Sequence, residues 1–326
     1  ITIAKLGTLT ITAGSPSAIN YGGSTPANSF SASGRAANDV ISGVTYSYSG
    51  TSGTSYGPSA TAPTLPGDYL ITPSAATFST GSSSNYTTIT YVAGTWKINA
   101  ATLVITAASP ATIFYGDTKA ADTFTATGLN AADSINGITY TYRGSGATIY
   151  GPTTTAPTAA GSYTITPSAV TFADAASAAK YSTITYNPGS FEISKKALTV
   201  TPTNQDIVYG ATAAITFGVT GFATIGGTLE SAATAAGYTA PTCAVSTYSV
   251  TSNAGTTHTI TCSGGSATNY TFTTTATAIA TVIKATLTVT PDAKSVNYGD
   301  AAPTLTFTVN GFRNSQTASN AAGYVA

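Results

Sequence analysis

The stretch that decides the fold is Gly161-Ser162-Tyr163-Thr164-Ile165-Thr166-Pro167-Ser168-Ala169. Nearly the same string stands 94 residues earlier, at residues 67–75. Side chains alternate between two faces along a strand, so Tyr163 and Ile165 share one face and the threonines share the other. A third, altered copy at residues 255–262 has one residue inserted, with His258 in the place of the tyrosine and Cys262 in the place of the proline. These copies predict a chain built from repeated β-rich units.

Two anchors recur in the same order along the chain. The first is an alternating strand that begins at Leu9, Leu103, Leu198 and Leu287, and the second is a Tyr-Gly step at Tyr21, Tyr115, Tyr209 and Tyr298. Successive Tyr-Gly steps are 94, 94 and 89 residues apart, and so regular a period indicates tandem repeats. We assign residues 1–6 to the end of a preceding repeat, 7–100 to repeat 1, 101–195 to repeat 2, 196–284 to repeat 3 and 285–326 to a truncated repeat 4. We therefore expect the native polypeptide to continue in both directions.

The repeats fall into two subtypes without flexible spacers between them. Repeats 1 and 2 share tyrosine-rich strands at residues 43–48 and 137–142, whereas repeats 3 and 4 share Gly221-Phe222 and Gly311-Phe312. The junctions carry no Gly/Ser-rich or Pro-rich stretch, so adjacent repeats are expected to be coupled end to end. The predicted fold is all-β, a tandem array of small β-sandwich or β-grasp-like domains that forms an extended rod.

Composition excludes several partners. Only 7% of the residues are charged, and eleven basic side chains balance eleven acidic ones, so no long-range field would attract nucleic acid or an acidic membrane surface. No run of 18 apolar residues is present, which predicts that this segment does not span a membrane. The first residues lack the pattern of a signal peptide, as in a processed or internal segment.

The two cysteines lie in repeat 3. Cys243 and Cys262 each stand beside a strand, with 18 residues between them. In an extracellular chain this arrangement favours a disulfide worth ~3 kcal/mol over the alternative, a pair of buried free thiols. No C-x-x-C spacing or His/Cys cluster indicates a metal site, and His258 is predicted to replace an aromatic side chain rather than to act in catalysis. We predict no catalytic, cofactor-binding or metal-binding residue.

Three kinds of polar residue have both a structural and a chemical interpretation. Asp117, Asp122 and Asp133 could bind calcium near a Tyr-Gly step, but turn stabilisation is preferred. Junction lysines could form isopeptide bonds, although protection of strand edges is the default; they are Lys97, Lys195, Lys196 and Lys284. The sequons at Asn85 and Asn269 each begin a strand, so a turn followed by a strand explains them without glycans.

Tyrosines alternate with small residues in the tyrosine-rich strands, which gives an aromatic row on one face. Most of this row is expected to be core, while part could form an interface. The candidate interface residues are Tyr46, Tyr48, Tyr140 and Tyr142.

Taken together, these anchors resemble the MBG repeat domains of bacterial surface proteins, of the type named for a Tyr-Gly-x step. The matching motifs are Lys-Ala-Leu-Thr-Val-Thr at residues 196–201, Lys-Ala-Thr-Leu-Thr-Val-Thr at 284–290, Tyr298-Gly299-Asp300, Gly221-Phe222 and Asn-Tyr-Thr-Phe at 269–272. The resemblance covers the chain and is closest from Lys196 onward. It implies spacer domains in very long, secreted, adhesin-like or filamentous polypeptides, and it brings no catalytic residues.

Two classes of function follow from these observations. In the first, the chain is a structural stalk or building block of an extracellular surface filament, with neighbouring repeats and identical chains as partners. In the second, it is an adhesin module that recognises surface glycan or matrix through exposed tyrosines. An enzyme ranks third, because no constellation of residues supports catalysis.

Overall fold

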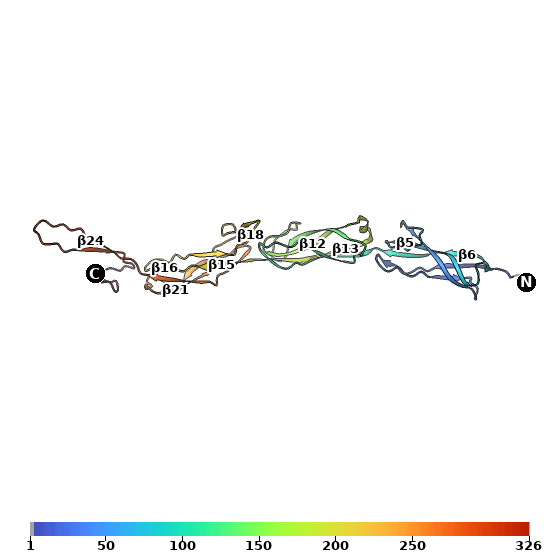
Figure 1. Cartoon of the computed structure of the whole chain (residues 1–326), viewed down its shortest axis with the longest axis horizontal. Coiled ribbons are helices and arrows are strands. Elements are labelled where there is room, and N and C mark those ends of the chain that lie inside the picture. The colour runs from blue at the N-terminus through green and yellow to red at the C-terminus, as the bar shows by residue number, and fades with distance from the viewer. Residues whose placement is uncertain (1–2, 326) are drawn as a thin grey trace. The chain divides into compact units, whose positions relative to one another are not determined.

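The structure is a computed structural model described for residues 3–325. Strands dominate it from the N-terminus to the C-terminus (Figure 1). Within the described residues the helical segments are two short 3-10 helices, η1 (Ser83–Asn85) and η2 (Ala175–Lys180). The all-β prediction is therefore confirmed.

The chain divides into two compact units. One comprises Ile1–Pro110, Ala121–Ala156 and Tyr163–Phe191, and the other comprises Ala111–Ala120, Pro157–Ser162 and Glu192–Ala326. The limits of the four repeats remain predictions, and the repeat numbers are kept below as names for those residue ranges.

Three sheets share one strand order, with the alternating anchor strand in the middle, an antiparallel neighbour on one side and a parallel neighbour on the other. In order, they are β3 (Phe30–Ser33), β1 (Leu6–Ala13) and β6 (Tyr86–Val92); β10 (Phe124–Thr127), β8 (Ala101–Ala107) and β13 (Tyr181–Asn187); and β17 (Phe217–Thr220), β15 (Lys196–Pro202) and β22 (Tyr270–Thr273).

Three further sheets share a second, four-stranded order, and each places the short strand before a Tyr-Gly step parallel to the last strand of its repeat. They are β2 (Ile19–Asn20), β7 (Gly94–Asn99), β5 (Gly67–Thr80) and β4 (Val40–Thr51); β9 (Ile113–Phe114), β14 (Gly189–Ser194), β12 (Gly161–Phe172) and β11 (Ile135–Gly144); and β16 (Gln205–Val208), β23 (Thr277–Ile283), β21 (Thr257–Ser263) and β20 (Thr242–Val245). Two strand pairs complete the structure: β18 (Thr224–Ile225) with β19 (Thr228–Leu229), and β24 (Thr288–Pro291) with β25 (Phe307–Asn310).

A three-stranded and a four-stranded sheet share a core. Leu9 and Ile11 of β1 are fully buried with Tyr86 of β6, and Ile41 and Phe78 from the four-stranded sheet pack against them. Because every second side chain of β1 faces this cluster, the alternation in the sequence becomes the inner face of a β-sandwich. The tandem β-sandwich prediction is thereby confirmed.

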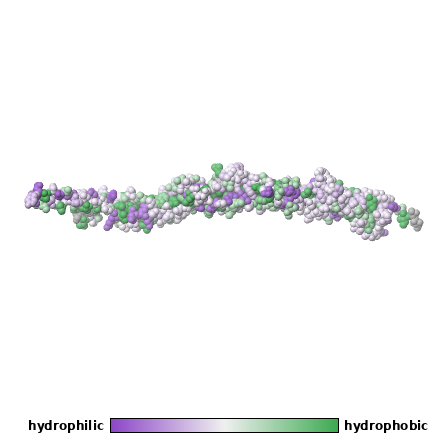
Figure 2. Space-filling view, turned by 45° about the horizontal axis from the view of Figure 1, so that its top comes forward, coloured by the Kyte–Doolittle hydropathy of each residue, from purple (hydrophilic) through white to green (hydrophobic). Residues whose placement is uncertain are grey.

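The surface reflects the low charge of the chain. On the face drawn in Figure 2, most residues have intermediate hydropathy, and hydrophobic and hydrophilic residues gather in small scattered groups. In the part of the chain that the structure describes, no helix is long and apolar enough to cross a membrane.

The predicted disulfide between Cys243 and Cys262 is present. These residues lie directly opposite each other on the antiparallel strands β20 and β21. The corresponding cross-strand pairs are Tyr46 with Pro73 in repeat 1 and Tyr140 with Pro167 in repeat 2. Repeat 3 therefore has a covalent bond at the register position where repeats 1 and 2 pair tyrosine with proline.

His258 occupies an aromatic position. Its ring packs edge-on against Tyr248 with centroids 5.6 Å apart. Tyr69 makes the same edge-on contact with Tyr56, at 5.8 Å, and Tyr163 makes it with Tyr150, at 5.6 Å. The side chain of His258 thus serves packing on β21.

Candidate functional site at the repeat junctions

A buried tyrosine begins the parallel strand of each three-stranded sheet, at Tyr86, Tyr181 and Tyr270. Each hydroxyl accepts a hydrogen bond from a backbone N–H, at 3.0 Å in every case; the donors are Ala36, Asn130 and Ala223. Each hydroxyl also donates to a carboxylate; the acceptors are Asp39, Asp133 and Glu230. We call this tyrosine, carboxylate and backbone N–H the junction cluster of its repeat.

A glycine two residues before the N–H donor shapes the loop of the junction cluster. Gly34, Gly128, Gly221 and Gly311 all have positive φ, and a Cβ added to any of them would lie within 2.3–2.6 Å of a backbone carbonyl oxygen. Only glycine accepts both the conformation and the close approach. Gly-Phe distinguishes repeats 3 and 4 in the sequence, but its glycine has a counterpart with positive φ in all four repeats. The pattern that identifies this glycine in the sequence is Phe-x-x-x-Gly, which begins at Phe30, Phe124, Phe217 and Phe307.

The Tyr-Gly step of one repeat packs on the junction cluster of the next. Tyr21 lies edge-on to Tyr181 with centroids 6.0 Å apart, and it packs against the hydrophobic core cluster of repeat 2. Tyr115 lies edge-on to Tyr270 at 5.3 Å. These contacts join consecutive repeats through aromatic rings rather than through the chain alone.

The glycine of the step allows this contact. Gly22 and Gly116 both have positive φ. A Cβ on Gly22 would lie 2.4 Å from the Asn130 side chain, and one on Gly116 would lie 2.6 Å from the Ala223 Cβ. The Tyr-Gly pair therefore combines a ring that reaches the next repeat with a backbone that lets the next loop approach.

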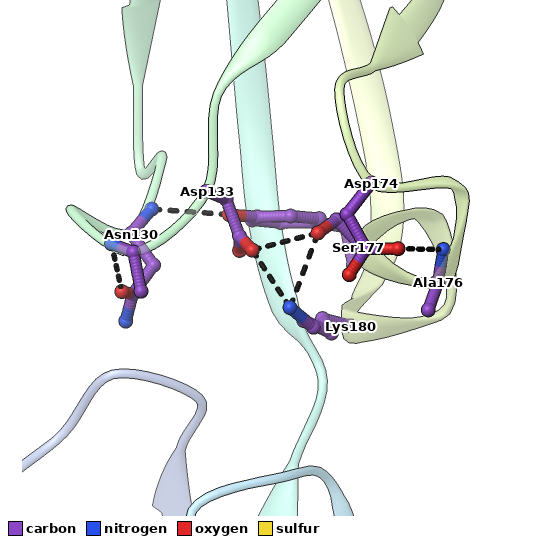
Figure 3. A network of polar contacts seen from close by, with 8 residues as sticks. Asn130, Asp133, Asp174, Ala176, Ser177 and Lys180 are labelled. Carbon is purple, nitrogen blue, oxygen red and sulfur yellow. Dashed lines mark hydrogen bonds and ion pairs between the residues drawn. The ribbon is translucent and has the colours of Figure 1, made fainter.

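At the junction between repeats 1 and 2, the junction cluster includes an ion pair between Lys180 and Asp133 (Figure 3). The Asp133 side chain is 1% exposed, and it accepts hydrogen bonds from Lys180 Nζ at 2.7 Å, Ser177 Oγ at 2.7 Å and Tyr181 at 2.8 Å. Lys180 Nζ also lies 5.6 Å from the centroid of the Tyr21 ring, which adds a cation–π contact between the repeats.

These donors determine the charge of Asp133. Burial by itself raises the pKa of the carboxyl group, but the hydrogen bonds from Lys180, Ser177, Tyr181 and Tyr21 outweigh burial and lower the pKa to about 2. The same hydrogen bond to Asp133 raises the pKa of Lys180 against the opposing effect of burial. The ion pair is therefore fully charged at neutral pH.

At the junction between repeats 2 and 3, the carboxylate of Glu230 bridges the two repeats. Tyr115 donates to Glu230 Oε1 at 3.1 Å, and Tyr270 donates to Glu230 Oε2. Burial, together with the hydrogen bond to Glu230, raises the pKa of Tyr270 to about 12, and burial is the main cause of the raised pKa of Tyr115. A third link joins the Ala160 N–H to Asn269 Oδ1 at 3.0 Å. Both oxygens of Glu230 thus bind phenol groups from consecutive repeats.

The family model of the MBG domain (YGX type) matches residues 198–279 and 287–326. These two stretches, within repeats 3 and 4, are therefore similar to MBG domains. The match lies where the resemblance of the sequence is closest. Repeats 1 and 2 share the junction glycine with repeats 3 and 4, and their sheet order and junction cluster are those of repeat 3. An MBG match together with a disulfide points to an extracellular protein.

Known proteins and solved structures resemble this chain only weakly. No curated protein matches this sequence. The I9–I11 tandem of titin is 12% identical with a TM-score of 0.23, over 86% of this chain and 98% of that one. The four N-terminal Ig domains of Dscam1 isoform 4.44 are 8% identical with a TM-score of 0.22, over 74% and 67%, and Drosophila N-cadherin EC1-4 is 10% identical with a TM-score of 0.22, over 84% and 72%. At such TM-scores these structural likenesses support no conclusion about this chain.

The three aspartates that were grouped in the sequence have separate partners. Asp117 accepts the Phe114 N–H at 3.0 Å and stabilises its Tyr-Gly turn, which is the preferred interpretation above. Asp122 accepts a hydrogen bond from Tyr142, and Asp133 belongs to the junction cluster. Among the junction lysines, Lys97 pairs with Asp68 at 3.3 Å on the surface.

The four candidate interface tyrosines divide into two pairs. Tyr48 and Tyr142 are each 4% exposed and belong to the core, so they offer no surface to a partner. Tyr46 and Tyr140 are half-buried beside the cross-strand prolines Pro73 and Pro167. The sequence could not separate the pairs, because all four share the alternation of one strand face.

Proposed function

We propose that this chain is a structural repeat segment of a very long bacterial surface protein, acting as a stalk or as the building block of a surface filament. The observation that carries this proposal is the packing of two Tyr-Gly steps, at Tyr21 and Tyr115, on the junction cluster of the next repeat. Tyr115, Glu230 and Tyr270 form one connected group across a repeat junction.

The junctions suit a load-bearing array for a physical reason. Asp133 is buried and Glu230 is half-buried. A carboxylate held in this way by phenol or ammonium donors is costly to separate from them, because each group would lose its partner before it regained water. Nearest-neighbour contacts of this kind raise the stability of every repeat that has a neighbour. Near-zero net charge also lets identical chains pack side by side with little repulsion.

The structural role is preferred to the adhesin alternative because two of the four candidate tyrosines lie in the core. Binding of glycan or matrix would then depend on the half-buried Tyr46 and Tyr140. Tight binding of a defined sugar by one repeat, in a tandem array with no elongated form, would reverse this preference.

Electron microscopy of native material from the cell surface tests the proposal. A continuous filament that is wider than one small domain, with an axial repeat, would make these repeats the building blocks of a polymer. Thin single threads that end in a distinct knob would make the segment a spacer. Compact particles without any elongated form would contradict both versions.

A further inference from the structure

A cavity of about 360 Å³ opens at the junction between repeats 1 and 2. The Tyr-Gly step of repeat 1 and the loop of repeat 2 that holds Asn130 and Ala132 both line it. All of its lining residues belong to one compact unit, and repeats 1 and 2 each have both of their sheets. The volume lies within the range of about 300–1,000 Å³ that small-molecule sites have.

The more buried part of the lining is apolar. Ile98 is 2% exposed, Pro63 is also buried, and Ile19 is half-buried. The half-buried Tyr21 lines the cavity as well. A ligand therefore meets hydrocarbon groups on this side and gains affinity by burying its own C–H groups against them.

Neutral hydrogen-bonding groups line the more exposed part. Thr25 and Thr64 are exposed, and each contributes a hydroxyl group. Asn130 Oδ1 accepts the Ala132 N–H at 2.9 Å, whereas Nδ2 has no acceptor among the described residues. Nδ2 lies at the Tyr-Gly step, since a Cβ on Gly22 would be 2.4 Å from it, and Figure 3 shows the side chain pointing towards repeat 1.

The charge of the lining restricts the class of ligand. Among the described residues, no charged side chain lines the cavity, and the charges of Lys180 and Asp133 beside Tyr21 are paired with each other at 2.7 Å. An ion would lose hydration here without gaining a counter-charge. A wholly apolar molecule would cover Asn130 Nδ2 without offering it an acceptor. The ligand that fits is neutral, with C–H groups on one side and hydroxyl groups on the other.

We infer that this junction cavity binds one neutral pyranose unit of a glycan, with the C–H face of the sugar ring on Ile98 and Pro63 and a hydroxyl oxygen that accepts from Asn130 Nδ2. Because the sugar contacts both repeats, its binding also stabilises their junction. The site lies away from the candidate tyrosines Tyr46 and Tyr140 and needs two consecutive repeats. It does not rest on the stalk role, since a spacer and a filament can both carry it.

The junction between repeats 2 and 3 provides an internal control. The residue that corresponds to Asn130 is Ala223, which has no side-chain donor. Tyr115 is 8% exposed, and its hydroxyl donates to Glu230. We therefore expect no sugar to bind at this second junction.

Three methyl glycosides test the inference with the unaltered chain: the methyl β-D-pyranosides of glucose, galactose and mannose. Amide NMR spectra follow the titration residue by residue. We expect at least one glycoside to shift the side-chain amide of Asn130 and the backbone amides of Gly22 and Gly23 to saturation, and to leave Gly116 and Ala223 unmoved. Cyclohexanol, a ring of the same size with one hydroxyl group, should bind at least about tenfold more weakly, because it makes fewer hydrogen bonds.

Two substitutions separate the amide donor from the fold of its loop. Asn130→Asp keeps an oxygen for the Ala132 N–H but removes the donor, and Asn130→Ala introduces the residue type that repeats 1 and 3 have at this position, as Ala36 and Ala223. Both should weaken binding of the glycoside at least about tenfold. Asn187→Ala, at an exposed asparagine of repeat 2, should leave binding unchanged.

Four outcomes overturn the inference. They are the failure of all three glycosides to bind, equal binding of cyclohexanol, binding by the Asn130→Asp variant as tight as that of the unaltered chain, and saturable shifts at the junction between repeats 2 and 3 instead. None of them bears on the elongated form of native material, which electron microscopy tests separately.

Discussion

At the scale of single residues, buried polar groups decide how the repeats hold together. Asp133 is buried, yet it stays charged because it accepts hydrogen bonds from Lys180, Ser177 and Tyr181. Two of these donors, Lys180 and Tyr181, also contact the Tyr21 ring of repeat 1. Trp96, in contrast, has a buried polar atom, its indole Nε1, that lacks a hydrogen-bond partner within the described residues. An orphaned donor of this kind costs about 1–3 kcal/mol.

Asp133 makes stability dependent on acid pH. Its pKa in the folded chain is about 2, below the usual value of 3.8, so its contribution is fully present above about pH 4 and is lost as the pH falls towards 2. We expect a loss of roughly 2 kcal/mol over that interval. Urea unfolding at several pH values measures it. Asp133→Asn should remove this part of the pH dependence, and equal acid sensitivity of both proteins would contradict the assignment.

Trp96 should tolerate phenylalanine. Trp96 packs on Tyr69 with centroids 6.2 Å apart, and in repeat 2 Phe191 packs on Tyr163 at the same distance. Trp96→Phe removes the orphaned donor and keeps an aromatic ring, so we expect a change in unfolding free energy within about 1 kcal/mol. Trp96→Ala should cost roughly 3–5 kcal/mol. Thermal unfolding measures both, and a large loss in the phenylalanine variant would show that the indole N–H is satisfied in solution.

At the scale of elements, the two subtypes differ in how they secure one hairpin. The antiparallel pair β4–β5 extends from Thr51 back to Val40, whereas β20–β21 extends only from Thr242 to Val245. A shorter ladder holds its outer strand less firmly, and β20 is an outer strand of its sheet. The disulfide lies within this short ladder, so we interpret it as a replacement for the missing strand length.

Loss of this disulfide should therefore destabilise repeat 3 selectively. We expect the double variant Cys243→Ser/Cys262→Ser to lose ~3 kcal/mol, the contribution of a cross-link that closes a loop of this size. Hydrogen exchange resolved by residue locates the loss, which should fall on β20 and β21. Reduction of the unaltered chain is the matched control and should reproduce the effect, while the variant should not respond to reductant. Uniform loss across repeats 1 and 2 would refute the interpretation.

At the scale of the whole molecule, the junction clusters couple repeat 1 to repeat 2 and repeat 2 to repeat 3. Tyr115 belongs to repeat 2 by sequence, but its ring and hydroxyl contact Tyr270 and Glu230 of repeat 3. Neighbouring repeats are therefore not independent folding units. A substitution in one repeat should change the stability of the next.

Two substitutions at the same motif separate coupling from local effects. Tyr115 is buried, whereas Tyr298 of repeat 4 is fully exposed. We expect Tyr115→Ala to cost roughly 3 kcal/mol, with faster hydrogen exchange at Tyr270 and Ala223 in repeat 3. Tyr298→Ala should change stability by less than about 0.5 kcal/mol. If both variants behave alike, or if exchange rises only in repeat 2, the junction does not couple the repeats.

The sequence by itself determined the repeat period, the all-β class, the strand alternation and the cysteine pairing. Each of these depends on short local patterns, such as the alternating strands, or on the spacing between such patterns. Only the tertiary structure decided which carboxylate meets which tyrosine. Tyr86 and Asp39 are 47 residues apart, and Tyr115 and Glu230 are 115 residues apart in different repeats. It also decided which tyrosines are core, since Tyr46 and Tyr48 have the same local pattern. Long-range pairing depends on how sheets pack, and packing is a property of the folded chain that no local pattern contains.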